Sequence, residues 1–353
     1  MNNNYLTGKE DGRKKKRKQI TNNKKIIITY EDINKFEIES KKKDNDNWNK
    51  IREQIICDII NKEIPEEFYI NGNLCDQWKN LRENINKYLE DFRKRLNIKK
   101  VTRIDCIKRG GRTYNYDFEI SFYCNKGVIT YNIEFKFNCD SISNCPQFSS
   151  PCKPSKYLFK NFESWFYDNH LSQISKYVNL DMPDKKEYIK TINNNDVECM
   201  KEYKKLYDEN KNFKKKCRDI SREAINEFVS IVELDIEKLS DYLKKSQNNK
   251  HYMLYKNGNI YYDSMNENIY EIINIESKNK MNFICKTKSK MKLQVKLRFK
   301  NGCGLQFPAF QISRKIPLKK DLINICIKNN IFLDNKSLVK DIKKKLDENN
   351  IIY

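Results

Sequence analysis

The sequence contains few of the residues and segments that mark fibrous, linker or membrane-spanning proteins. Only 9 Gly and 7 Pro occur among 353 residues, which excludes collagen-like and proline-rich classes. No apolar run approaches the roughly 20 residues that a membrane-spanning helix needs. The first eighteen residues, MNNNYLTGKEDGRKKKRK, include no apolar segment of the kind that forms a secretory signal. We therefore expect an intracellular protein, in the cytoplasm or the nucleus, with no membrane partner.

Closely spaced metal-binding pairs are also missing. The chain has 12 Cys but no Cys-x-x-Cys motif, and its only histidines are His170 and His251. The closest cysteines, Cys139, Cys145 and Cys152, are separated by five and six residues, whereas structural zinc and iron–sulfur sites favour tight pairs. Because disulfide frameworks belong to short secreted chains, the pattern favours reduced thiols that pack as small hydrophobic side chains.

Positive charge, in contrast, is abundant. The 70 Lys and Arg exceed the 48 Asp and Glu and give a formal net charge of +22. Phosphate backbones are the commonest partners of such a field, so a nucleic acid is the expected partner. The sequence is also saturated with Lys, Asn, Ile and Tyr, as AT-rich codons would produce. Base composition therefore accounts for part of the charge, and basicity alone favours a nucleic-acid partner only modestly.

The length predicts about two domains, at roughly 150 residues each. Residues 1–47 are expected to form a basic, largely disordered tail. Its run from Arg13 to Lys18 is either a solvated arm or a nuclear-localisation or phosphate-binding patch. Composition and periodicity divide the rest into a core, a helical insertion, a β-rich region that packs on the core or stands alone, and C-terminal helices: 48–180, 181–250, 251–318 and 319–353, respectively.

Apolar spacing predicts the elements within these parts. Spacings of three and four predict two helices between residues 48 and 97, the second of them over 76–97. The period then changes to two, which predicts a meander of strands over 101–137. A helix is predicted over 157–177, and further hairpins are predicted around Asn257-Gly258 and around residues 301–304.

The second and third strands of the meander carry the candidate chemistry. Asp117 and Glu119 share one side of their strand, and Glu134 and Lys136 share one side of theirs. A turn centred near Lys126-Gly127 would place residue 117 opposite 135 or 136, and residue 119 opposite 134. Cross-strand neighbours approach to about 5 Å between Cβ atoms. An acid from one strand and a Glu-x-Lys pair from the next can therefore meet at one point.

Such a group suits Mg²⁺ or Mn²⁺. A hard divalent ion accepts one or two carboxylates and keeps several waters, which leaves positions for a phosphate oxygen and an attacking water. The backbone carbonyl of Phe135 could supply a further oxygen. Lys136 could hold the attacking water or stabilise the transition state.

The order of a helix, a meander with Asp117 and Glu134-Phe135-Lys136, and a further helix resembles the core of the PD-(D/E)xK nuclease superfamily. The resemblance covers residues 76–180 and implies an α/β protein with a restriction-endonuclease-like core, in which a mixed sheet is flanked by helices. In that family the acid of the second core strand and the Glu of the third bind Mg²⁺, and the Lys assists the water. These roles would fall on Asp117, Glu134 and Lys136.

The resemblance implies further site residues. The family's first core helix often adds an acid, which would be Glu83 in the helix over 76–97, and Glu119 is a further candidate ligand. Gln173 and Tyr177, four residues apart on one helix face, look like the Gln-x-x-x-Tyr helix of the RecB/Cas4-like branch. Two departures are present: no proline precedes Asp117, and the cysteines lack the spacing of that branch's iron–sulfur sites.

The expected function is therefore Mg²⁺-dependent hydrolysis of DNA phosphodiester bonds. Glu-x-Lys also occurs at Glu39, Glu202, Glu209 and Glu276, but only Glu134 has an acid across a tight hairpin. Three alternatives stay open: an exposed charged face of the meander, a non-catalytic nucleic-acid-binding or structural protein, and a protein–protein scaffold. Endonucleases and exonucleases, DNA and RNA substrates, and any oligomeric state are all compatible with this pattern.

Overall fold

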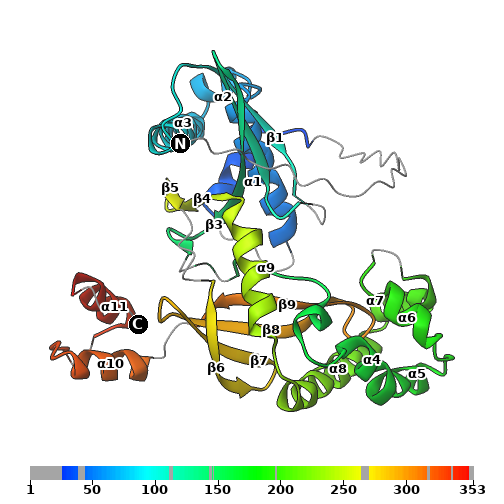
Figure 1. Ribbon diagram of the computed structural model, residues 1–353. Coiled ribbons are helices and arrows are strands. Elements are labelled where there is room, and N and C mark those ends of the chain that lie inside the picture. The colour runs from blue at the N-terminus through cyan, green and yellow to red at the C-terminus, as the bar shows by residue number, and fades with distance from the viewer. Residues whose placement is uncertain are drawn as a thin grey trace.

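The computed structural model describes residues 26–38, 44–110, 114–142, 145, 147–194, 197–263, 270–315, 319–334 and 337–349. They form an α/β protein with a mixed five-stranded sheet and a separate four-stranded antiparallel sheet (Figure 1). Within these ranges, no helix combines the length and the apolar character that crossing a membrane would require. The basic run from Arg13 to Lys18 lies outside the described residues.

Helices and strands follow one another along the chain in a mixed order. The α-helices are α1 (Asn45–Ile60), α2 (Glu67–Ile70), α3 (Cys75–Arg95), α4 (Phe162–Phe166), α5 (Ser172–Val178), α6 (Lys185–Thr191), α7 (Lys201–Glu209), α8 (Lys211–Ile231), α9 (Ile236–Asn248), α10 (Lys319–Lys328) and α11 (Val339–Glu348). Short helical turns are η1 (Tyr30–Phe36), η3 (Pro154–Tyr157), η4 (Tyr167–Leu171) and η5 (Glu198–Met200). The strands are β1 (Val101–Lys108), β2 (Phe118–Cys124), β3 (Gly127–Phe137), β4 (His251–Lys256), β5 (Asn259–Asp263), β6 (Ile272–Asn279), β7 (Asn282–Thr287), β8 (Lys292–Asn301) and β9 (Gln306–Arg314).

The first sheet has the strand order β1-β2-β3-β4-β5. The predicted meander forms its first three strands, and β4 pairs in parallel with β3. A parallel pair cannot be closed by a tight turn and needs a long crossover, which residues 138–250 supply. The β4–β5 hairpin turns at Asn257 and Gly258, both with positive φ, as a two-residue hairpin turn requires.

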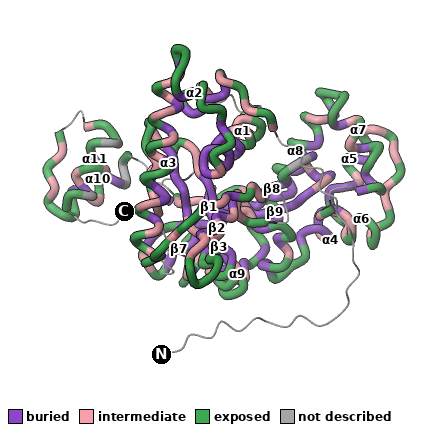
Figure 2. Tube along the Cα trace, turned by 90° about the horizontal axis from the view of Figure 1, so that it is seen from above, coloured by how far each residue is buried: buried purple, intermediate pink, exposed green. Residues whose placement is uncertain are grey.

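One face of this sheet is covered by α1 and α3. Alternate residues of β2, such as Phe118 and Ile120, pack with Ile133 and Phe135 of β3 against this helical layer. Trp78 of α3 is fully buried in the same core. Figure 2 shows buried positions gathered between these helices and the strands, with exposed positions on the outer sides of the helices. The predicted helix over 76–97 is therefore confirmed as α3, within two residues at each end.

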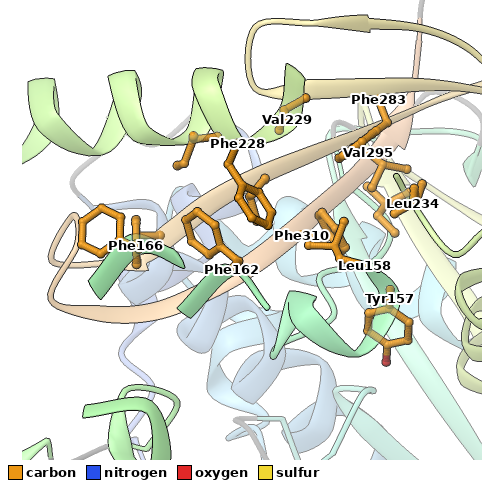
Figure 3. Close-up of a cluster of buried hydrophobic side chains, with 14 of the residues drawn as sticks. Tyr157, Leu158, Phe162, Phe166, Phe228, Val229, Leu234, Phe283, Val295 and Phe310 are labelled. Atoms are coloured by element: carbon orange, nitrogen blue, oxygen red, sulfur yellow. The ribbon is translucent and has the colours of Figure 1, made fainter. Parts of the chain in front are cut away.

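The second sheet, with the order β6-β7-β8-β9, builds a separate core with helices of the crossover. Phe162 of α4 lies between Phe166 of the same helix and Phe228 of α8 (Figure 3), and the ring centroids of Phe162 and Phe228 are 5.0 Å apart. The long helix α9 adds Leu239 and Leu243 to this core. Tyr252 and Leu254 of β4 also belong to it, so the two cores meet at that strand.

The parts of the chain divide differently from the predicted boundaries. Residues 251–263, placed with the β-rich region, form β4 and β5 of the first sheet. Residues 157–180, placed in the core, pack instead in the second core, where the helix begins at Phe162 with Asn161 as its N-cap and contains a π-helical stretch. Within the expected tail, η1 buries Ile33 and Phe36. Periodicity reveals which residues form an element but not which sheet an element joins.

Candidate active site

Asp117 and Glu134 lie next to each other at the end of the meander. β2 and β3 pair with Phe118 opposite Ile133, and the backbone N–H of Asp117 also donates to the Ile133 carbonyl, at 2.9 Å, which places Asp117 beside the residues that start the pairing. The prediction that residue 117 lies opposite 135 or 136 is wrong, because the turn has only Asn125 and Lys126 between the paired residues 124 and 127. The observed turn is centred one residue earlier than the predicted one, so each residue of β2 pairs with a residue of β3 that is two positions earlier than predicted.

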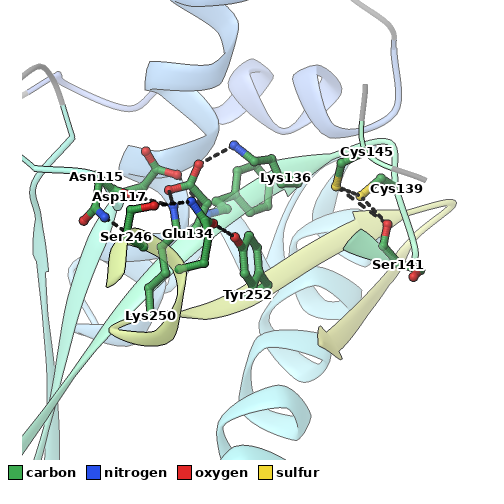
Figure 4. Close-up of polar contacts among 12 residues, drawn as sticks. Asn115, Asp117, Glu134, Lys136, Cys139, Ser141, Cys145, Ser246, Lys250 and Tyr252 are labelled. Atoms are coloured by element: carbon green, nitrogen blue, oxygen red, sulfur yellow. Dashed lines mark hydrogen bonds and ion pairs between the residues drawn. The ribbon is translucent and has the colours of Figure 1, made fainter. Parts of the chain in front are cut away.

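Direct contacts join the predicted residues (Figure 4). Asp117 Oδ2 accepts a hydrogen bond from the backbone N–H of Phe135, at 2.8 Å. Lys136 Nζ forms an ion pair with Glu134 Oε1. The side chains of Asp117, Glu134 and Lys136 therefore meet at one place, as the sequence predicted.

A second lysine completes the group. Lys250, in the turn between α9 and β4, places its Nζ 3.0 Å from Glu134 Oε2 and 2.6 Å from the carbonyl oxygen of Asn115. Its side chain is only 3% exposed, against 24% for Lys136. Sequence reasoning missed Lys250, because it reaches Glu134 only once β4 pairs with β3. The one local signal is its position directly before a strand.

Glu53 of α1 is a further acid near the site. Burial, and next the negative charge of Asp117, raise the pKa of Glu53 to about 8, while Lys108 opposes the rise. α1 therefore places an acid near Asp117, whereas the sequence pattern predicted an acid at Glu83 of α3. Glu83 is exposed, and the side chain of its neighbour Asn84 donates to the Gly258 carbonyl. Tyr252 is the residue that pairs with Glu134, and Gly258 lies six residues further along the chain, a length of about 20 Å in an extended strand.

Glu119, a further candidate ligand, does not join Asp117 and Glu134. It lies opposite Asn132, and its carboxylate accepts hydrogen bonds from Arg109 Nη2 and the Tyr116 hydroxyl, both at 2.6 Å. Burial alone would raise the pKa of Glu119, but these two donors outweigh it and lower the pKa. The Glu119 carboxylate therefore forms an ion pair with Arg109 beside the site.

Gln173 and Tyr177 of α5 lie in the second core. Gln173 Nε2 is 3.5 Å from Nδ1 of His170, and the Tyr177 ring stacks on Phe213. Neither lines the cavity that contains Asp117 and Glu134. Two glutamines do so: Gln147, and Gln247 of α9, whose side-chain oxygen accepts a hydrogen bond from the Tyr252 hydroxyl. The spacing of Gln173 and Tyr177 gave their shared helix face correctly, but not the place of that helix in the fold.

The site opens into a cavity of about 580 Å³ between the two sheets. Residues from the meander, from the segment before α4, from α9 and from the end of β8 line it. The lining combines the two acids with lysines and tyrosines: Asp117, Glu134, Lys136, Lys153, Lys156, Lys250, Lys300, Tyr114, Tyr116, Tyr157 and Tyr242. Cationic and aromatic groups thus surround the carboxylates on several sides.

The two carboxylates have opposite protonation tendencies. Burial, and next the charge of Glu134, raise the pKa of Asp117 to about 7. Burial also acts on Glu134, but the positive charges of Lys136 and Lys250 outweigh it and lower the pKa of Glu134. Glu134, and next Asp117, raise the pKa of Lys136 despite its burial. Lys136 is therefore a cation paired with the ionised Glu134, and of the two carboxyls Asp117 takes up a proton first as the pH falls.

The donor set fits a hard divalent ion. Among the residues that the structure describes, no group of three or more His, Cys, Asp and Glu side chains is arranged to hold a metal. Two carboxylates do stand together, and the N–H of Phe135 points to Asp117. Because the N–H and C=O of one strand residue face the same neighbour, the Phe135 carbonyl is directed to that side as well. Two carboxylates and one carbonyl are oxygen donors of the kind that Mg²⁺ and Mn²⁺ prefer.

Comparison with known proteins adds no relative to this picture. Neither a scan against protein-family models nor a search of the curated proteins finds a match for this chain.

Proposed function

We propose that this protein is a nuclease that uses Mg²⁺ or Mn²⁺ to hydrolyse phosphodiester bonds, with DNA as its substrate, on a restriction-endonuclease-like core. The observation that carries the proposal is the meeting of Asp117, Glu134 and Lys136 at the end of an antiparallel hairpin. Support for the fold comes from the mixed sheet, in which β4 pairs in parallel with the strand of Glu134, and from α1, whose Glu53 lies near Asp117.

Each residue has a separate part in this chemistry. Asp117, Glu134 and the Phe135 carbonyl would hold the ion, with Glu53 as a further acid close by. The ion supplies a positive charge at the phosphate and a lower pKa for a bound water. Lys136 extends into the cavity and would orient the attacking water or offset charge on the phosphate oxygens.

Lys250 is a positioning residue in this scheme. It is buried, and it binds both Glu134 and the Asn115 carbonyl, so it fixes the carboxylate to the segment that precedes β2. A nucleic-acid substrate is favoured because lysines and tyrosines line the rest of the cavity, and these residues contact phosphates and stack on bases. DNA is the substrate that the resemblance to the nuclease superfamily implies.

One observation favours a second candidate, a nucleic-acid-binding protein without catalysis. Both carboxylate oxygens of Glu134 already contact a lysine. The same group could therefore be a structural ion-pair network. That alternative predicts salt-sensitive binding to DNA, no dependence on a divalent ion, and no effect of Glu134→Gln.

Cleavage by the Lys136→Ala variant separates the two. We expect the full-length protein to cut single- or double-stranded DNA with Mg²⁺ or Mn²⁺, and Lys136→Ala to lower the rate by at least about 100-fold while DNA affinity stays nearly unchanged. The matched control is Lys126→Ala, which removes an exposed lysine from the turn of the same hairpin and should cut at the wild-type rate. Failure of the wild-type protein to cut any DNA form, or wild-type cleavage by Lys136→Ala, would contradict the proposal.

A further inference from the structure

The second sheet has two faces of opposite character. On β8, Leu293, Val295, Leu297 and Phe299 are buried in the second core. Side chains alternate along a strand, so the intervening positions lie on the opposite, outer face. We call these positions the β8 row: Lys292, Gln294, Lys296, Arg298 and Lys300. Lys292 and Lys300 are exposed, and the other three are partly exposed.

The neighbours of the β8 row are mostly polar and include few acids. On β9, Ser313 and Gln311 lie opposite Gln294 and Lys296, and Arg298 Nη1 donates to Gln311 Oε1 at 2.7 Å. On β7, Asn282 lies opposite Lys296, and Lys286 lies directly opposite Lys292. Among the described residues of this face, Glu276 of β6 forms an ion pair with Lys292.

Glu276 offsets the charge of Lys292, but the cations of the β8 row outnumber the acids beside it. Like charges that lie opposite each other on neighbouring strands destabilise a sheet, and Lys286 and Lys292 form such a pair. A row of cations with few acids gains stability when an anionic ligand lies along it. The charge of the β8 row therefore points to a ligand with repeated negative charges.

The β8 row leads to the candidate active site. Lys300, its last member, lines the cavity, with Nζ 3.4 Å from the Ser150 carbonyl oxygen. Lys153 and Lys156 are exposed and line the same cavity. A positive surface thus runs from the outer face of the second sheet to the cavity of Asp117 and Glu134.

We infer that the β8 row binds the phosphate backbone of the nucleic acid and guides it to the cavity. The eight residue steps from Lys292 to Lys300 span about 27 Å at about 3.4 Å per residue. B-DNA rises about 3.4 Å of axis per base pair, so the row is about as long as eight base pairs of duplex. The row contains no aromatic side chain, so it presents charges to phosphates and no ring that could stack on a base. The inference rests on the proposed function only in assigning DNA as the ligand and the cavity as its destination.

The test compares two double charge reversals in the full-length protein. Lys296→Glu with Arg298→Glu changes the β8 row, and Lys215→Glu with Lys216→Glu makes the same change of charge on exposed positions of α8, which packs against the inner face. Binding of a fluorescent duplex of about 30 base pairs is measured in EDTA over a range of salt concentrations. We expect at least about a tenfold loss of affinity and a salt slope smaller by about two for the β8-row variant, and little change for the α8 variant.

Two further measurements exclude other causes of a loss of DNA affinity. The neutral pair Lys296→Gln with Arg298→Gln should show part of the loss with an unchanged thermal midpoint, which excludes misfolding as the cause. A duplex of about 8 base pairs is too short to occupy the row and the cavity together, so its affinity should differ less between the variants. Equal affinities of the β8-row and α8 variants for the long duplex would overturn the inference. Because EDTA prevents cleavage, a failure of the proposed nuclease activity would leave this binding result intact.

Discussion

At the scale of single residues, the two lysines that hold Glu134 are not equivalent. Lys250 is almost completely buried and also binds the Asn115 carbonyl, whereas about a quarter of the Lys136 side chain is exposed to the cavity. A buried cation with two fixed acceptors keeps a carboxylate in place. A lysine that reaches solvent can exchange its carboxylate partner for a phosphate oxygen or a water. In the proposed function, Lys250 is therefore the positioning lysine and Lys136 the one that takes part in the reaction.

The acid of α1 gives the sharpest prediction at this scale. Glu53 lies near Asp117, and its pKa of about 8 keeps the carboxyl largely protonated at neutral pH while no cation is bound. Because a divalent ion at the proposed site would favour the ionised carboxylate, we expect Glu53→Gln to weaken Mn²⁺ affinity and slow cleavage by at least about tenfold. Titration of Mn²⁺ together with a cleavage assay would measure both effects.

The control for this prediction is Glu83→Gln, the same change on the exposed side of α3. It should leave both Mn²⁺ affinity and cleavage unchanged. Equal effects of the two substitutions would show that α1 supplies no special acid. A larger effect of Glu83→Gln would restore the assignment that the sequence pattern favoured.

At the scale of elements, α9 positions one side of the cavity. Tyr242 and Gln247 of this helix line the cavity, and Lys250 follows two residues after the helix ends. The helix begins at an N-cap in which Asp235 Oδ1 accepts a hydrogen bond from the backbone N–H of Lys238, at 3.0 Å. The position at which α9 begins therefore helps to set where Tyr242, Gln247 and Lys250 lie in the cavity.

Removal of this cap should destabilise the protein by a measurable amount. We expect Asp235→Ala to lower the free energy of unfolding by about 1 kcal/mol, whereas Asp219→Ala on the exposed side of α8 should change it little. Hydrogen bonds from the side chain and next the backbone of Lys238 lower the pKa of Asp235. The contribution of the cap is thus present above the ordinary pKa of an aspartate and is lost as the pH falls through the lowered value. Urea unfolding at neutral and at acidic pH would test both points, and an equal loss for the two variants would contradict them.

Local elements could be predicted from the sequence, but their assembly could not. The meander, α3 and the Asn257-Gly258 hairpin follow from spacing and turn residues that lie close together in the chain. The place of β4 beside β3 depends on a crossover of more than 100 residues, and the sequence of neither strand indicates which strand it pairs with. For the same reason Lys250 and Gln247 were missed. The convergence of Asp117, Glu134 and Lys136 was predictable because one short hairpin contains all three.

At the scale of the whole molecule, β4 joins the two cores. Its Tyr252 and Leu254 face the second core, while Met253 and Tyr255 face the first. The cavity lies beside this strand and is lined from both sheets. The acids come from the first sheet, and Lys153, Lys156 and Lys300 come from the part of the chain that forms the second core. The proposed function therefore requires both parts to bring a phosphate to Asp117 and Glu134.

The most direct test of this account is the position of a bound metal. Anomalous scattering from crystals of the full-length protein soaked in Mn²⁺ would locate the ion without any assay. We predict one Mn²⁺ at about 2.0–2.3 Å from an oxygen of Asp117 and an oxygen of Glu134, with the Phe135 carbonyl close by. The same crystals of the Glu134→Gln variant should lack it. An ion bound elsewhere, or a Glu134 that keeps both lysines at saturating Mn²⁺, would contradict the claim that these residues form a metal-dependent nuclease site.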